Sequence, residues 1–224
     1  MEFSNRVTAM LGVETPIVQA PMGWIARSQL ASAVSNSGAM GIIETSSGEL
    51  DVIRAEIIKM RQLTDKPFGV NVAQAFVRDP DIVNFIIDQG VTFVSTSAGN
   101  PERYTEQLKS AGLTVFHVVP SLSAALKAVQ CGVDGLIVEG GEGGGFKNPK
   151  DVSTMVLLPL VRSKVDVPII AAVGYSMGLR WRRLLLWEPR ACKWARAWFP
   201  RTNRRCISIG RMRSSLQKRQ TPCF

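Results

Sequence analysis

Short apolar runs rich in β-branched residues alternate along the chain with segments whose apolar positions have helical spacing. Each apolar run predicts a buried strand, and each intervening segment predicts a helix that covers the sheet. The predicted strands are Ile17–Met22, Ala39–Glu44, Phe68–Ala73, Phe93–Ser97, Thr114–Val119, Gly135–Glu139 and Pro168–Ala172. The predicted helices are Ser28–Ser37, Leu50–Leu63, Asp81–Gln89, Pro101–Ser110, Ser123–Gln130 and Asp151–Arg162.

About seven successive βα units favour the α/β class and a (β/α)8 TIM barrel over an open sheet. Such barrels run to about 250 residues and carry their sites on the loops that follow the strands. This chain has 224 residues, and its eighth unit would fall in the C-terminal part. The sequence therefore predicts an incomplete barrel whose eighth unit is lost or non-native.

Charge divides the chain at about residue 173. Residues 1–173 hold 14 Lys and Arg against 17 Asp and Glu, whereas residues 174–224 hold 13 Lys and Arg and a single acidic residue, Glu188. The tail also contains four of the five tryptophans and three of the four cysteines. These shifts predict a cofactor-binding barrel domain over 1–173 and a basic, poorly ordered tail over 174–224.

Two interpretations of the tail compete. Basic residues interleaved with aromatic residues can bind nucleic acid through phosphates and base stacking. Tryptophan and arginine codons also accumulate when a GC-rich gene is translated out of frame, and we favour this frameshift interpretation. It predicts that the tail forms no eighth strand, because a buried parallel strand needs a near-continuous apolar run. A tail strand paired with both the first and the seventh predicted strands would contradict it.

Three segments carry candidate chemistry. Glycine-rich residues follow the sixth predicted strand, from Glu139 and Gly140 to Gly144, where a ligand could approach the backbone closely. A flexible surface loop is the alternative. Pro21 and its neighbours end the first strand and could lie beneath a flat ring. Asn71 lies inside the third strand, where a buried amide needs partners that either the core or a ligand could supply.

His117 is the single histidine of the chain and lies in the fifth predicted strand. Strand alternation directs it either into the barrel or toward the helices, so a catalytic role competes with the more common structural one. Cys131, just before Gly132, is interpreted as a small apolar residue at a helix end. The sequence shows no metal-ligand cluster, no Ser-His-Asp arrangement and no Walker motif.

Together these motifs resemble the nitronate monooxygenase (2-nitropropane dioxygenase-like) family of FMN-dependent TIM barrels, to which FMN-dependent enoyl-acyl-carrier-protein reductases are close relatives. The matching text spans roughly residues 5–172 and consists of TPIVQAPMGW, SNSGAMGIIE, KPFGVNV, FVSTSAGNP, TVFHVVPS, VDGLIVEGGEGGGF and VPIIAA. Shifted by one base, the tail can be read as GAEGVQMGTRMVSS, which resembles the family's eighth strand.

The resemblance implies FMN as the cofactor and assigns roles to several residues. Pro21 and Met22, with Ala20 beside them, would line the flavin ring, and Asn71 would hydrogen-bond it. The glycine-rich loop would contact FMN through Glu139, Gly140 and Gly144. The family's general-base histidine falls at Phe146, which can neither accept nor donate a proton.

The phosphate end of the implied cofactor site also departs from the family. Members hold the FMN phosphate with Gly-Gly after the seventh strand and Gly-Thr after the eighth. This chain has Val173-Gly174 at the first place, so Gly174 alone is kept, and it lacks the second. We therefore expect this chain to bind FMN weakly or not at all.

The implied activity is oxidation of alkyl nitronates with O2 by an FMN-dependent oxidoreductase. An FMN- and NAD(P)H-dependent enoyl-acyl-carrier-protein reductase and an inactive frameshifted product are the alternatives. We expect a small-molecule substrate and neither a nucleic-acid nor a membrane partner, and the sequence does not indicate an oligomer. The absence of a secretory signal, a long apolar span and paired cysteines favours a cytoplasmic protein.

Overall fold

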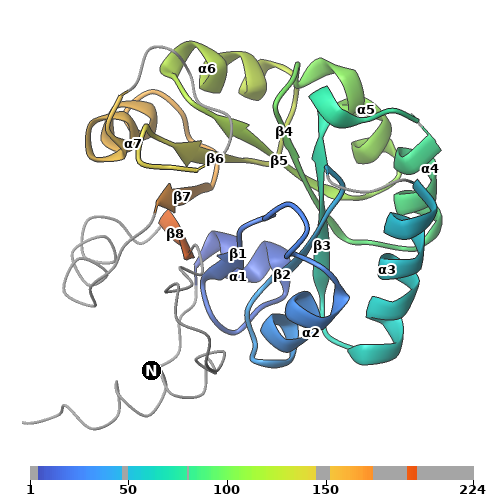
Figure 1. The fold of residues 1–224 in the computed structure, drawn as a ribbon. Coiled ribbons are helices and arrows are strands. Elements are labelled where there is room, and N and C mark those ends of the chain that lie inside the picture. The colour runs from blue at the N-terminus through green and yellow to red at the C-terminus, as the bar shows by residue number, and fades with distance from the viewer. Residues whose placement is uncertain (1–4, 47–49, 80, 145–151, 174–190, 196–224) are drawn as a thin grey trace, which may run out of the picture.

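The structure is a computed structural model that describes residues 5–46, 50–79, 81–144, 152–173 and 191–195. These residues form one curved sheet of parallel strands with helices on its outer side (Figure 1). The strands are β1 Ile17–Gln19, β2 Gly41–Glu44, β3 Phe68–Ala73, β4 Phe93–Ser97, β5 Thr114–Val119, β6 Gly135–Glu139, β7 Ile169–Val173 and β8 Ala191–Ala195.

The eight strands are ordered β1-β8-β7-β6-β5-β4-β3-β2, and the two ends of this order meet. A parallel bridge joins Val18 of β1 to Met40, next to β2. In this bridge Met40 N donates to Ile17 O at 2.9 Å, and Gln19 N donates to Met40 O at 2.9 Å. The sheet thus closes into the ring of a (β/α)8 barrel, which confirms the predicted fold class.

Helices follow the strands as the pattern predicted, except at the N-terminus. β3, β4, β5 and β6 have the predicted bounds, whereas β1 stops at Gln19, two residues before Pro21, which has no backbone N–H.

A short helix before β1, Arg6–Leu11, was not predicted. It begins at a capping box in which Asn5 and Thr8 bond each other's backbone N–H groups. The helices are α1 Arg6–Leu11, α2 Ser28–Asn36, α3 Leu50–Leu63, α4 Asp81–Asp88, α5 Glu102–Ser110, α6 Leu122–Gln130 and α7 Thr154–Arg162, with a 3-10 turn η1 at Gln74–Phe76.

The tail supplies an eighth strand, so the expectation that the barrel stays open is wrong. In β8, Lys193 lies opposite Ile17 of β1 on one side and opposite Ala171 of β7 on the other. The physical reason is that β1 and β7 both expose backbone donors and acceptors, which an extended segment can satisfy whatever its side chains. This pairing contradicts the structural consequence of the frameshift interpretation. Any helix after β8 would fall at 196–224, outside the described residues.

Two layers of core hold the sheet. The larger layer joins strand residues such as Val70 and Leu136 to the inner faces of the helices. The second layer fills the barrel with alternate strand residues, and α1 closes it from the end where the strands begin. There the rings of Phe93 and Phe116 meet edge to face, with centroids 5.5 Å apart.

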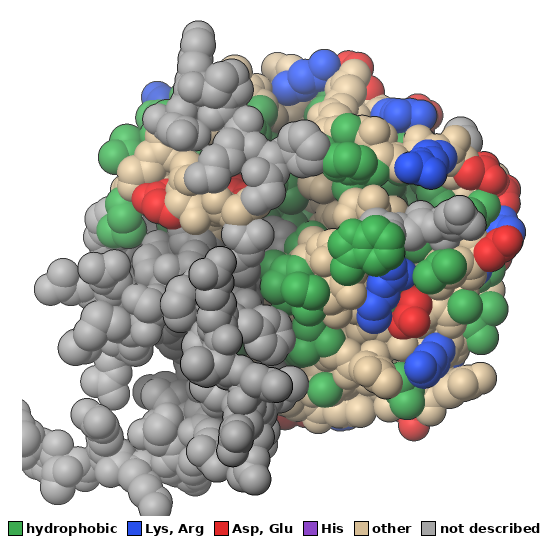
Figure 2. All heavy atoms as spheres, in the orientation of Figure 1, with side chains coloured by type: hydrophobic (Ala, Val, Ile, Leu, Met, Phe, Trp, Pro, Cys, Tyr) green, Lys and Arg blue, Asp and Glu red, His purple; other side chains and the backbone are tan. Residues whose placement is uncertain are grey.

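Positive and negative side chains are interspersed over the described part of the face shown in Figure 2. Apolar side chains lie singly among them or in small groups. Within the described ranges, no helix is both long and apolar enough to cross a membrane.

Candidate active site

Polar side chains gather inside the barrel where the parallel strands end. Glu44 and Asn71 face the interior because they alternate with Ile43, Val70 and Val72, which pack against the helices. Glu44 lies beside Asn71 in the β2–β3 register, and Asn71 lies beside Ser95 in the β3–β4 register. In β6, Glu139 occupies the same interior row and pairs with Ala172 of β7.

Asn71 is 2% exposed and is bonded mainly through its amide nitrogen. Nδ2 donates to Ser95 O at 3.1 Å and to Ser95 Oγ at 3.0 Å. Oδ1 accepts a longer hydrogen bond of 3.4 Å from Ser97 Oγ. The amide is therefore fixed in orientation, and its oxygen keeps acceptor capacity toward the barrel interior.

The loop that follows β1 brings Ala20, Pro21 and Met22 to the same end of the barrel. All three are partly exposed. Met22 N donates to Ala20 O at 2.9 Å, and Ala26 N donates to Met22 O at 2.8 Å. Ala20 packs against the interior core, so this loop forms part of the rim.

Glu44, which sequence reasoning missed, fixes that loop. Its side chain is fully buried and lies 3.4 Å from Arg27 Nη2. Glu44 Oε1 accepts from Trp24 N at 3.2 Å, and Oε2 accepts from Ser46 N at 2.7 Å. Trp24 has a φ of 64°, a conformation that is rare for a bulky residue. The signal in the sequence was an acidic residue that closes an apolar run.

The glycine-rich loop after β6 lies against the start of α7. Gly140 N donates to Thr154 Oγ1 at 3.0 Å, and Gly141 N donates to Val152 O at 2.9 Å. Glu139, Gly140 and Gly144 are all partly exposed. Gly174 and Phe146 lie outside the described residues, so their predicted roles stay predictions.

His117 faces the helix layer and not the barrel interior. It shares a face of β5 with Val115 and Val119, which belong to the core under the helices. The ring is 4% exposed, and its Nδ1 lies 2.7 Å from Thr96 Oγ1. Burial lowers the pKa of His117 to about 4, although a hydrogen bond with the Gly99 backbone acts to raise it. The placement favours the structural alternative.

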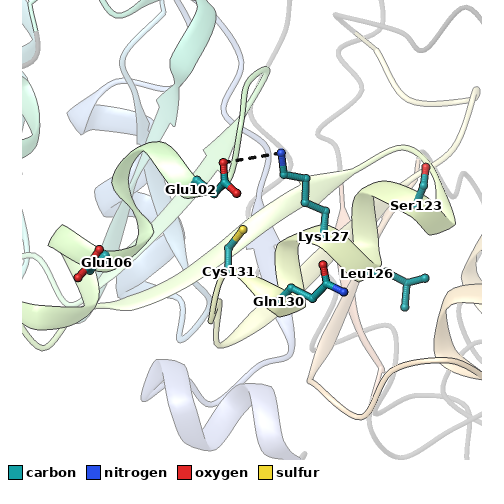
Figure 3. Close-up of a pocket in the computed structure, with 7 residues that line it drawn as sticks. All are labelled: Glu102, Glu106, Ser123, Leu126, Lys127, Gln130 and Cys131. Carbon is teal, nitrogen blue, oxygen red and sulfur yellow. Dashed lines mark ion pairs between the residues drawn. The ribbon is translucent and has the colours of Figure 1, made fainter.

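A separate groove lies on the outside of the barrel between α5 and α6 (Figure 3). Glu102 and Lys127 form an ion pair there, and Cys131 is one of the lining residues. Burial raises the pKa of the Cys131 thiol, which keeps it protonated. Among the described residues, no group of three or more His, Cys, Asp or Glu side chains could hold a metal ion.

The parallel strands and the helices outside them define the class of protein, which is a TIM barrel. The chain belongs to the nitronate monooxygenase family, whose sequence model, described as "Nitronate monooxygenase", matches residues 4–178.

Two curated relatives illustrate the family's range. A (3aS,4S,5R,7aS)-5-hydroxy-7a-methyl-1-oxo-octahydro-1H-indene-4-carboxyl-CoA dehydrogenase from Mycobacterium tuberculosis is 38% identical over 181 residues, which cover 80% of this chain and 50% of the relative. A nitronate monooxygenase from Pseudomonas aeruginosa is 26% identical over 222 residues, which cover 79% and 63%. This chain thus spans about half the length of the first of these relatives.

Solved structures agree with the fold. FabK from Thermotoga maritima has a TM-score of 0.80 and 37% identity, over 86% of this chain and 61% of that one. Nitroalkane oxidase from Streptomyces ansochromogenes has a TM-score of 0.72 and 26% identity, over 84% and 66%.

Proposed function

We propose that this chain is an FMN-dependent oxidoreductase that oxidises alkyl nitronates with O2. The observation that carries the proposal is the rim itself. Asn71 offers an oriented amide at the end of the barrel, and the Ala20–Met22 loop borders the same opening. Family membership supports this use of the rim.

The residues present at the ring end suit a flavin. Ala20 and Ala172 place small side chains at the upper edge of the interior core, and Asn71 Oδ1 can accept a hydrogen bond from a heterocycle N–H. Bound there, the flavin would supply the electron chemistry, while the protein would supply orientation and exclusion of water. At the phosphate end the sequence has Val173 where the family has glycine, so we expect binding to be weak.

The position of His117 favours a nitronate over a neutral nitroalkane as the substrate. A nitroalkane must lose a proton from the carbon beside its nitro group, and this step needs a base within hydrogen-bond reach. His117 is the single histidine of the chain and lies on the helix side of β5. A nitronate has already lost that proton, so its oxidation does not require an imidazole at the rim.

Reduction of an enoyl thioester is the second candidate, supported by the likeness to FabK and to the CoA dehydrogenase. This reaction would need NAD(P)H and a proton donor. The two candidates therefore differ in their co-substrate, which is O2 for nitronate oxidation and NAD(P)H for enoyl reduction.

Oxygen uptake by the full chain with added FMN distinguishes them. We expect O2 consumption with propyl nitronate and little with neutral nitropropane at the same pH. A control reaction follows NADPH oxidation with crotonyl-CoA. Rapid NADPH oxidation that depends on crotonyl-CoA, without nitronate-dependent O2 uptake, would favour the reductase. Inactivity in both assays, with no flavin absorbance near 450 nm in the protein after free FMN has been removed, would favour the inactive alternative.

A further inference from the structure

Glu142 ties the glycine-rich loop to the first turn of α7. Its carboxylate accepts a hydrogen bond from Ser153 Oγ at 2.6 Å. It also accepts two from Thr154, one from the backbone N at 2.8 Å and one from Oγ1 at 2.9 Å. Partial burial acts to raise the pKa of Glu142, but these hydrogen bonds outweigh it and lower the pKa to about 2. The carboxylate is therefore ionised at neutral pH.

Thr154 connects this contact to the backbone of the rim. Its Oγ1 bonds Glu142 and also accepts from Gly140 N at 3.0 Å. The approach is close enough that a Cβ added at Gly140 would lie 2.3 Å from Thr154 N. The loop therefore fits against α7 in a specific position and not loosely over it.

The same carboxylate accepts from the first backbone N–H of α7, that of Thr154. The first backbone N–H groups of a helix have no partner within the helix and attract anions. Here Thr154 N is taken by Glu142, so this end of the helix is already neutralised from within the chain.

From this geometry we infer that Glu142 is a positioning residue that holds the β6 loop, from Glu139 to Gly144, in its place at the barrel rim. The inference rests on the proposed function in so far as the loop contacts a flavin. Glu142 acts through the loop, because its carboxylate bonds Ser153 and Thr154.

A residue that only caps α7 would act differently from a residue that positions the loop. Loss of a cap lowers the melting temperature without changing the affinity for a ligand at the rim. Loss of positioning lowers that affinity. It also speeds hydrogen exchange of the loop amides in the chain without cofactor. Two readouts therefore separate the roles.

The test compares Glu142→Ala and the conservative Glu142→Gln with Glu106→Ala, which removes an exposed glutamate on the outer surface of α5. Amide hydrogen exchange of the 139–144 segment is measured on the full chain without FMN. FMN affinity is measured by quenching of flavin fluorescence. We expect faster exchange in the segment and roughly tenfold weaker FMN binding for Glu142→Ala, with Glu142→Gln intermediate. Glu106→Ala should match the wild type.

The outcomes are distinct. Unchanged exchange and unchanged FMN affinity in both Glu142 variants would overturn the inference, whatever happens to the melting temperature. Faster exchange in a chain whose wild type binds no FMN would support the positioning of the loop and overturn the proposed flavin function. If Glu142→Ala fails to fold, Glu142→Gln gives the same comparison.

Discussion

The strands in the body of the barrel and the strand in its tail differ in how clearly the sequence marks them. In the body, β3 to β6 coincide with apolar, β-branched runs visible in the sequence. In the tail, β8 has the sequence Ala-Cys-Lys-Trp-Ala, which carries no such signal, and yet it pairs on both sides. Side-chain pattern therefore selects strands where helices cover them, whereas an unpaired strand edge can recruit a further strand through the backbone alone.

The family match also separates the body from the tail. It ends at residue 178, close to the predicted boundary at 173, while β8 begins at Ala191. The tail thus completes the sheet without matching the family sequence. The division into a 1–173 domain and a 174–224 tail stays a prediction, since most of the tail lies outside the described residues.

We expect the greatest loss of stability from a substitution in β8. Lys193→Pro removes a backbone donor from a strand with partners on both sides. The carbonyl that loses this donor is left unpaired, and an unpaired buried group costs about 1–3 kcal/mol. We expect a lower melting temperature and aggregation, measured by thermal unfolding with light scattering. Lys193→Ala, which keeps the backbone donor, is the control. Equal melting temperatures for the two variants would show that β8 contributes nothing to stability.

A smaller effect concerns His117 in the body. Because burial depresses its pKa to about 4, the unfolded chain binds more protons than the folded chain between about pH 6.5 and 4. Stability should therefore be full above pH 6.5 and fall by about 2–3 kcal/mol as the pH drops to about 4.5.

Urea unfolding at both pH values measures this loss. His117→Gln should remove the pH-dependent part, and His117→Ala should leave turnover within a few-fold. Loss of turnover in a folded, FMN-bearing His117→Ala variant would instead restore the catalytic interpretation.

A comparable or smaller loss of stability should follow from overpacking the interior of the body. A Cβ at Gly135 would lie 2.3 Å from Phe116 Cζ inside the barrel. Gly135→Ala should cost about 1–3 kcal/mol through overpacking, as measured by urea unfolding. Adding Phe116→Leu should recover part of this loss. Full stability of Gly135→Ala alone would mean that the interior can adjust.

Sequence reasoning predicted the barrel class, most strand bounds and a buried Asn71 within the third strand. These succeed because burial on both faces leaves a continuous apolar run, and because parallel strands end at one edge. The face of His117 could not be predicted, since strand alternation alone allows both directions until the register is known.

Other features depended on contacts between distant segments. Glu44 meets Trp24 and Arg27 across β1 and β2, and Glu142 meets Thr154 across the loop that joins β6 to α7. A single sequence shows the acidic residue but not its partner. The strand β8 was missed for a similar reason, because its cause lies in the edges of β1 and β7.

We propose that the body of this chain binds FMN at the barrel rim, with ring contacts kept and phosphate contacts weakened. Fluorescence titration of FMN tests it most directly, with the wild type, Asn71→Ala and Val173→Gly measured together. We predict weak, saturable binding by the wild type, a loss of roughly tenfold for Asn71→Ala and a gain of roughly tenfold for Val173→Gly. Tight stoichiometric FMN in the wild type, or equal affinity in all three proteins, would contradict the account.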